Sequence, residues 1–161
     1  MPLDLDTDFP NLHDVLCGEH DSNYEYRAIS VFDAWLGPSR YHELDCDAAT
    51  YQERERRLDD FSSRLLSATQ VLRLKIGDGA DGSPVAVIPF ESKLEVQQYA
   101  RQSSPDTPGG EFFQLMLPDW RCVYLESWNF ANVFFLRDLG PLDEIRQLAR
   151  DAGLFVLEKD W

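Results

Sequence analysis

The alternation of apolar and charged positions predicts two long helices. One covers residues 47–67, where apolar residues recur at helical spacing and arginines stand among Glu and Asp. The other begins at Pro141 and ends at Gly153, and acidic residues in its first turn complement the helix dipole. The apolar stripes are Tyr51, Leu58, Phe61 and Leu65 in the first helix, and Leu142, Ile145, Leu148, Ala149 and Ala152 in the second.

Short runs of β-branched and aromatic residues predict strands between these helices. A loop rich in Gly and Asp joins two of the strands as a hairpin, and turn residues join three others as an antiparallel meander. Two shorter helices are expected, at 11–16 and, with the capping pair Ser92 and Glu95, at 92–100. The predicted strands are 24–32, 71–76, 84–90, 111–117, 121–128, 132–137 and 154–157.

This order of elements is typical of the α+β class. Runs of strands separated by isolated helices predict a mainly antiparallel sheet with about three helices packed on one face. The 161 residues fit a single domain, 1–161, because no linker or repeat divides the chain. Residues 1–22, rich in Asp and with two early prolines, are expected to form an acidic N-terminal arm.

The negative charge is concentrated at the start of the chain. The net charge is −14, and residues 1–50 hold 11 acidic residues against only Arg27 and Arg40. Such a field repels nucleic acids and anionic membranes and attracts basic surfaces. The composition therefore excludes a general nucleic-acid-binding protein and favours a basic protein as partner.

Cysteine use and the N-terminus predict a cytoplasmic protein. Three widely spaced cysteines do not make a disulfide framework. The N-terminus is acidic and lacks the apolar stretch of a secretory signal, and no apolar run is long enough to span a bilayer.

Two Cys/His pairs have the spacing of zinc ligands. Cys17 and His20 form a C-x2-H pair, and His42 and Cys46 form an H-x3-C pair. A predicted strand separates the pairs, and their order is not that of the common zinc fingers. We therefore predict no metal and no other cofactor, and we retain these four residues as the candidates for a zinc site.

Motifs of catalysis are missing from the sequence. There is no G-x-S-x-G elbow and no H-E-x-x-H pair. Cys122 is interpreted as a small buried hydrophobic residue in a strand, and the carboxylate pairs of helix 47–67 as part of its solvated face. The prediction is that the protein is not an enzyme. The alternative is a small enzyme that uses Cys, His and carboxylate groups of the first third.

As a small, strongly acidic α+β domain without a catalytic motif, the chain resembles the immunity proteins of bacterial toxin–immunity pairs. The resemblance lies in size, charge and architecture over the whole chain, and no motif allows a family residue to be transferred. It implies an inhibitor that docks an acidic face on the basic active-site cleft of a cytoplasmic-acting toxin. An acidic nucleic-acid mimic or adaptor is a further alternative. The residues predicted to contact the partner are Glu19, Asp21, Asp33, Trp35, Glu43, Asp45 and Asp47.

Overall fold

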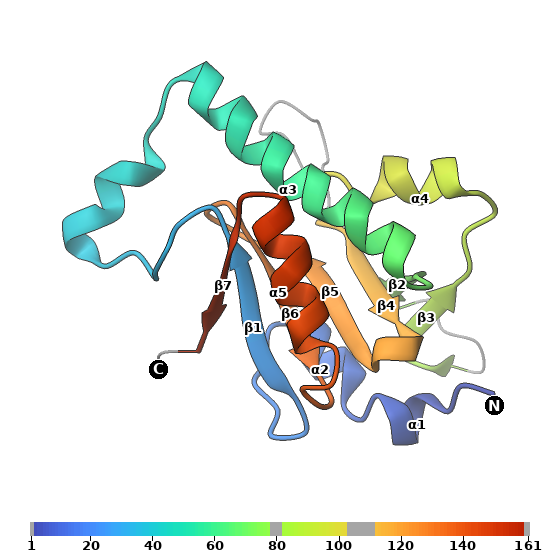
Figure 1. Cartoon of the computed structure of the whole chain (residues 1–161). Coiled ribbons are helices and arrows are strands. Elements are labelled where there is room, and N and C mark those ends of the chain that lie inside the picture. Colours follow the sequence, from blue (N-terminus) through green and yellow to red (C-terminus); the bar gives the residue numbers. More distant parts are fainter. Residues whose placement is uncertain (1, 78–81, 103–111, 160–161) are drawn as a thin grey trace.

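An antiparallel sheet of seven strands forms the centre of the computed structural model, which describes residues 2–77, 82–102 and 112–159 (Figure 1). Its strands follow the order β3-β2-β4-β5-β6-β1-β7. The strands are β1 (Glu25–Ser30), β2 (Leu72–Ile76), β3 (Val85–Ile88), β4 (Gln114–Leu117), β5 (Cys122–Glu126), β6 (Ala131–Leu136) and β7 (Phe155–Glu158).

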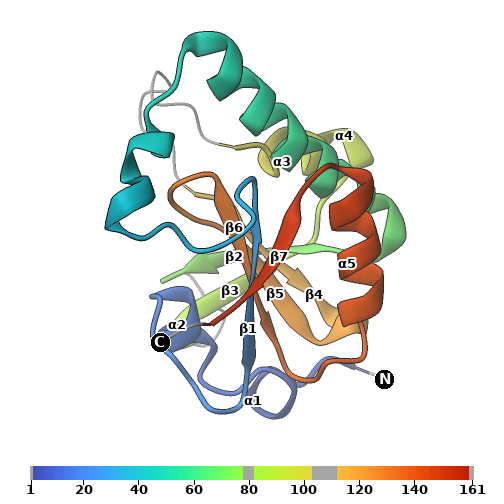
Figure 2. The same cartoon turned by 60° about the vertical axis from the view of Figure 1, so that its left-hand side comes forward.

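Helices cover both faces of this sheet. On one face lie α3 (Ala48–Ala68), α4 (Lys93–Tyr99) and α5 (Leu142–Asp151), and on the other lie α1 (Leu5–Asp8) and α2 (Leu12–Leu16) (Figures 1 and 2). Two 3-10 helices, η1 (Pro38–Leu44) and η3 (Pro118–Trp120), complete the described elements. The predicted α+β class with a mainly antiparallel sheet is confirmed.

The predicted meander forms the middle of the sheet. β4 pairs with β5 and β5 with β6, and every residue of β5 and β6 is buried. Helices cover both faces of these strands, in agreement with their mostly apolar sequences, and Glu126 and Asn132 are their buried polar residues. β2 and β3 form the predicted hairpin, closed by Gly77 N–H donating to the Pro84 carbonyl at 2.7 Å. Residues 78–81 of its loop and residue 111 of a predicted strand lie outside the described residues.

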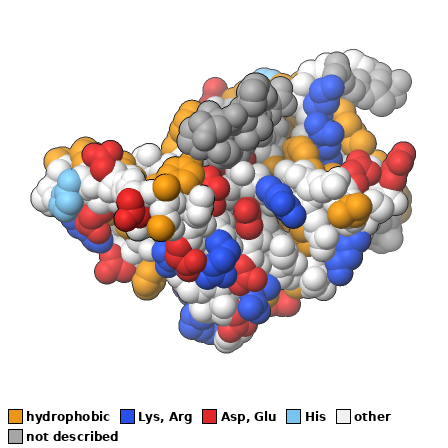
Figure 3. All heavy atoms as spheres, turned by 90° about the horizontal axis from the view of Figure 1, so that it is seen from above, with side chains coloured by type: hydrophobic (Ala, Val, Ile, Leu, Met, Phe, Trp, Pro, Cys, Tyr) orange, Lys and Arg blue, Asp and Glu red, His pale blue; other side chains and the backbone are white. Residues whose placement is uncertain are grey.

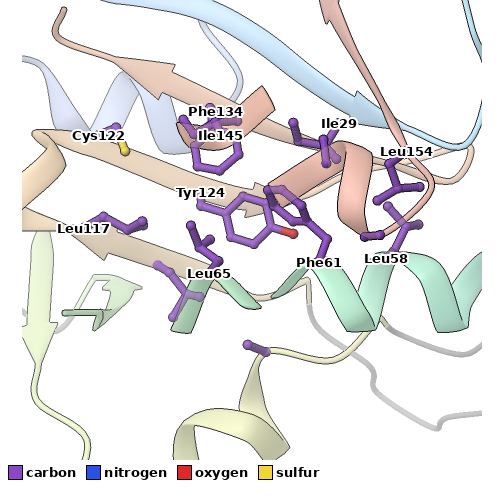
Figure 4. Close-up of a cluster of buried hydrophobic side chains, with 14 of the residues drawn as sticks. Ile29, Leu58, Phe61, Leu65, Leu117, Cys122, Tyr124, Phe134, Ile145 and Leu154 are labelled. Atoms are coloured by element: carbon purple, nitrogen blue, oxygen red, sulfur yellow. The ribbon is translucent and has the colours of Figure 1, made fainter. Parts of the chain in front are cut away.

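The larger core lies between the sheet and the α3/α5 layer. Phe61 of α3 packs against the rings of Tyr124 and Phe134, and these two rings stack at 4.7 Å between centroids (Figure 4). Of the predicted helical stripe, Leu58, Phe61 and Leu65 are fully buried, whereas Tyr51 is half-buried and packs on the Phe130 ring. The prediction for Cys122 also agrees with the structure, since this residue is fully buried and burial raises the pKa of its thiol.

A chain of hydrogen bonds crosses this core. The Tyr124 hydroxyl lies 2.9 Å from the Ser62 hydroxyl of α3, and it accepts a hydrogen bond of 2.7 Å from the Asn132 side chain. Asn132 also donates to the Gln102 side-chain oxygen at 2.8 Å. These bonds pair the Tyr124 and Ser62 hydroxyls and the Asn132 side-chain N–H groups, whose burial without a partner would be costly, while the Asn132 side-chain oxygen is buried without a hydrogen-bond partner.

The N-terminal segment differs from the arm that the sequence predicted. Its apolar residues Phe9, Leu12, Val15 and Leu16 are buried in a second core, on the face opposite α3. The acidic side chains of 1–22 cover the outside of this layer. Thus the segment is a structural layer of the domain. It covers the sheet face opposite to the one that α3, α4 and α5 cover.

Candidate protein-binding surface

The segment 33–47 extends beyond the sheet between β1 and α3, and we call it the projection. It contains η1 and leads into the N-terminal half of α3 (Figures 1 and 2). Gly37 precedes η1 and Pro38 occupies its first turn, where the fixed φ of proline suits a helix start. All of η1 is described, and none of its side chains is buried. The projection thus has no core of its own.

Arg40 ties the projection together with ion pairs. Its guanidinium is 2.5 Å from one Glu43 carboxylate oxygen and 3.1 Å from the other, and it also contacts the Asp33 carboxylate at 3.0 Å. These hydrogen bonds raise the pKa of Arg40 and lower the pKa of Glu43. A fork contact of this kind fixes orientation as well as attraction. Asp33 and Glu43 are therefore partly engaged inside the molecule.

Arg54 fastens the projection to the body of the domain. Its guanidinium carbon lies 4.9 Å from the centre of the Phe32 ring and 5.0 Å from that of Phe130, so the cation is placed against two aromatic rings. The same guanidinium donates to the Glu43 backbone carbonyl at 2.9 Å. One arginine of α3 thus connects η1 to the end of β1 and to the β5–β6 turn.

Asp47 has a structural role at the junction with α3. It is the N-cap of that helix, and its carboxylate accepts the Thr50 backbone N–H at 2.7 Å. This bond lowers the pKa of Asp47. The residue predicted to contact a partner therefore first defines where the helix begins.

Trp35, the predicted aromatic anchor, packs against the domain. Its ring stacks on Tyr26 at 6.2 Å between centroids, and its indole N–H donates to the Glu158 backbone carbonyl at 2.5 Å. These contacts hold the start of the projection against β1 and β7. Tyr41 is the exposed aromatic residue of η1, with 55% of its surface accessible.

Two of the predicted contact residues lie away from the projection. Glu19 and Asp21 precede β1, whereas Asp33 follows it, and a strand of six residues is about 20 Å long. Asp21 bonds to the backbone and side chain of Asn23 and to Asn11, which lowers its pKa. The structure therefore divides the predicted acidic face in two, and only Asp33, Glu43, Asp45 and Asp47 share the projection.

The zinc candidates are divided in the same way. Cys17 and His20 lie beyond the end of α2, and His42 and Cys46 lie in the projection, on the other side of β1. Cys17 approaches His13 instead, with 3.9 Å between Sγ and Nε2. Within the described ranges, no group of three or more His, Cys, Asp or Glu side chains is placed to hold a metal ion.

The exposed chemistry of the projection is acidic with one aromatic ring. It carries four carboxylates against one arginine, and Asp45 and Tyr41 are both exposed. Figure 3 shows acidic side chains gathered at this end of the molecule, with fewer basic ones among them. The sequence identified the carboxylates but not Tyr41. One feature of the sequence could have indicated an exposed Tyr41. The residue lies in a short segment that begins at Pro38 and has no periodic apolar positions.

A second group of carboxylates lies in a hollow of about 470 Å³ between α3 and α4. Burial raises the pKa of Glu55 and of Asp59, and Asp59 accepts the Gln102 backbone N–H at 2.8 Å. These two side chains are therefore partly buried, whereas the sequence placed the carboxylate pairs of the helix on its solvated face. The described residues that line the hollow include Arg56 and Arg101 but neither His nor Cys.

Comparisons with other proteins add no relative: no family model, curated protein or solved structure matches the chain. In the described ranges, no helix is long and apolar enough to cross a membrane. The site is therefore interpreted from its own geometry.

Proposed function

We propose that this protein is a binding protein that uses the projection to block a basic surface of a protein partner, in the manner of an immunity protein that neutralises a toxin. The observation that carries the proposal is the projection itself. It extends acidic side chains and Tyr41 away from the domain. Internal ion pairs and hydrogen bonds hold it in place, together with the packing of Leu36 and Leu44 against the main core.

Electrostatics gives the projection its preference for a basic partner. Its carboxylates exceed its single arginine, and the whole chain carries −14. A field of this sign speeds the approach of a cationic surface and disfavours an anionic one. Rim carboxylates mainly set the association rate, so a buried aromatic contact is needed for slow dissociation. Tyr41 has the residue type most often found in such central contacts.

Pre-organisation favours binding by the projection over a flexible acidic tail. Arg40 and Arg54 already hold η1 in place, so little conformational entropy is lost when a partner docks. A cleft in the partner can accept an element that extends from the domain. This supports inhibition by occlusion, with the partner expected to be an enzyme whose substrate is anionic.

The test compares wild-type protein with the double variant Tyr41→Ala/Asp45→Lys, immobilised at equal density in extract of the native cell. These two side chains make none of the ties described above, so the variant keeps the projection folded. We expect one cationic protein to be captured by the wild type and lost from the double variant. Titration calorimetry with that protein is expected to show at least tenfold weaker binding by the variant.

The matched control is Glu19→Lys, which makes the same charge reversal at an exposed position outside the projection. It is expected to retain the partner. Expression of the partner alone should arrest growth, and co-expression of the wild-type protein should restore it. Equal capture by the wild type and the double variant would overturn docking through the projection, and a partner that is harmless when expressed alone would overturn the inhibitor role.

A further inference from the structure

A hollow of about 490 Å³ is lined by residues of β2, β4 and α4 and by Phe112 and Trp128. In Figure 1 these three elements lie on the side of the domain away from the projection. It arises because β2 and β4 pair over only two residue pairs, Leu72 with Met116 and Arg73 with Leu115. Beyond Arg73, β2 continues to pair with β3 but separates from β4. The separation of neighbouring strands opens a space that side chains do not fill.

Tyr99 of α4 stabilises this separation. Its hydroxyl accepts the Gln114 backbone N–H at 2.9 Å, and it lies 3.4 Å from the Gln114 carbonyl oxygen, to which it can donate. These bonds satisfy the backbone of Gln114, the first residue of β4, which has no partner in β2. The hollow is therefore a built feature of the fold, with Tyr99 as part of its wall.

The charged groups that line the hollow are positive. Arg73 and Lys75 of β2 both line it, and no carboxylate is found among its described lining residues. The Arg73 guanidinium carbon lies 4.6 Å from the centre of the Tyr99 ring, and its Nε is buried without a hydrogen-bond partner. In a chain of net charge −14, a pair of cations at one hollow is a local reversal of sign.

Two aromatic rings, those of Phe112 and Trp128, also line the hollow. Trp128 has 73% of its surface exposed and meets the Phe112 ring at 4.7 Å between centroids. Trp128 precedes the β5–β6 turn, in which Asn129 and Phe130 adopt the left-handed conformation with φ of 60° and 58°. That conformation is costly for a bulky residue, and here it accompanies the packing of Phe130 on Tyr51. The turn thereby leaves Trp128 exposed beside the hollow.

We propose that this hollow binds a small anionic ligand that contains a planar ring, such as an aromatic phosphate or carboxylate. The ring stacks on Trp128, and the anionic group is bound by Arg73 with the charge of Lys75 nearby. The volume lies in the range of small-molecule sites. An extended nucleic acid is disfavoured, because its further phosphates would meet the acidic remainder of the surface.

The local charge can act in spite of the overall charge of the chain. At physiological ionic strength the Debye length is about 8 Å, so distant exposed carboxylates are largely screened from the hollow. An anionic group in the hollow is therefore attracted chiefly by the cation nearest to the Tyr99 wall, Arg73. This site is independent of the projection, and its failure would leave the proposed protein partner untouched.

Titration calorimetry and saturation-transfer NMR on the full chain test the site, with adenosine monophosphate and 4-hydroxybenzoate as probes. Adenosine and inorganic phosphate serve as the ring alone and the anion alone. We expect at least one of the two ring-bearing anions to bind about tenfold more tightly than either partial probe. Trp128→Ala and Arg73→Gln should each weaken that binding about tenfold, while Arg73→Lys should weaken it less.

Two control variants match these substitutions outside the hollow. Phe155→Ala removes an exposed aromatic ring of β7, and Lys93→Gln removes an exposed cation of α4. Both should change the affinity less than twofold. Since Trp128 is largely exposed, Trp128→Ala should leave the thermal unfolding temperature unchanged. This variant therefore still tests the site if Arg73→Gln unfolds. Binding unaffected by Trp128→Ala, or no preference for a ring-bearing anion over the partial probes, would overturn the proposal.

Discussion

Helix α3 has two halves that are held by different forces. In the C-terminal half, Leu58, Phe61 and Leu65 are fully buried under the α5 side of the domain (Figure 4). In the N-terminal half, residues 48–57, none of the side chains is buried, although this half extends about 15 Å along the helix axis. The same helix is therefore a core element at one end and the support of the projection at the other.

This difference shows how a small domain can present a rigid surface without enlarging its core. Apolar burial fixes the C-terminal half of α3. The backbone hydrogen bonds of the helix then extend the ordered conformation into its N-terminal half. Asp47 at the N-cap, together with Arg40 and Arg54, adds polar contacts at the far end, where Leu36 and Leu44 are only partly buried against the core. Polar ties of this kind contribute less free energy than a core contact, but they fix geometry.

The largest expected effect is the loss of a core ring from the buried half. Phe61→Ala should lower the free energy of unfolding by about 3–5 kcal/mol, because it removes a fully buried ring and leaves a cavity between α3 and the sheet. Urea unfolding followed by circular dichroism measures this loss. Gln52→Ala, an exposed change in the other half, should alter the free energy by less than about 0.5 kcal/mol. Similar losses for the two variants would show that the halves do not differ as described.

A smaller effect is expected where Arg54 fastens the projection. Arg54→Ala removes its contacts with Phe32 and Phe130 and its bond to the Glu43 carbonyl, and it should lower the free energy of unfolding by about 1–2 kcal/mol. Hydrogen exchange should show amides of η1 exchanging faster, while those of β5 and β6 are protected as in the wild type.

Arg54→Lys is the matched variant for this comparison. It keeps the charge but loses the planar group that lies against both rings, so it should restore only part of the stability. Unchanged exchange in η1 after Arg54→Ala would mean that the projection is ordered by other contacts.

The smallest expected effect is a difference in the pH dependence of the unfolding free energy between Asp59 of α3 and Glu43 of the projection. Burial raises the pKa of Asp59, so the folded state binds more protons than the unfolded state between the ordinary and the raised value. Stability therefore falls as pH rises through that window. In Asp59→Asn this contribution disappears, so the unfolding free energy of the variant relative to the wild type should increase from pH 4 to pH 7. The Asn side-chain oxygen can still accept the Gln102 N–H.

Glu43→Gln in the projection should show the opposite sign. Its pKa is lowered by Arg40, so its stabilising contribution is present above the ordinary pKa and is lost as pH falls through the folded value. Glu43→Gln should therefore be less stable than the wild type at pH 7, with the difference shrinking in acid. Urea unfolding at a series of pH values measures both variants. A common sign for Asp59→Asn and Glu43→Gln would contradict the assigned environments.

Local patterns sufficed for most elements of the fold. The stripe of α3, the turn chemistry of the β4–β5–β6 meander and the Gly-containing hairpin of β2 and β3 are interactions between near neighbours, and each appears where it was predicted. The short helix η1 was missed because its side chains follow no apolar period, and Leu44, its last residue, packs against the core without being fully buried. The N-terminal layer was misjudged because its many Asp residues concealed four buried apolar positions.

The sequence by itself determined the α+β class, the main helices and strands, and the excess of negative charge in the first third. These follow from periodicity, turn residues and composition, which need no knowledge of distant contacts. Only the tertiary structure decided which carboxylates share a surface. β1 places Glu19 and Asp21 at one end and the projection at the other. The hollow beside Trp128 likewise arises from the separation of β2 and β4, because strand pairing between distant segments is set by the packing of the whole sheet.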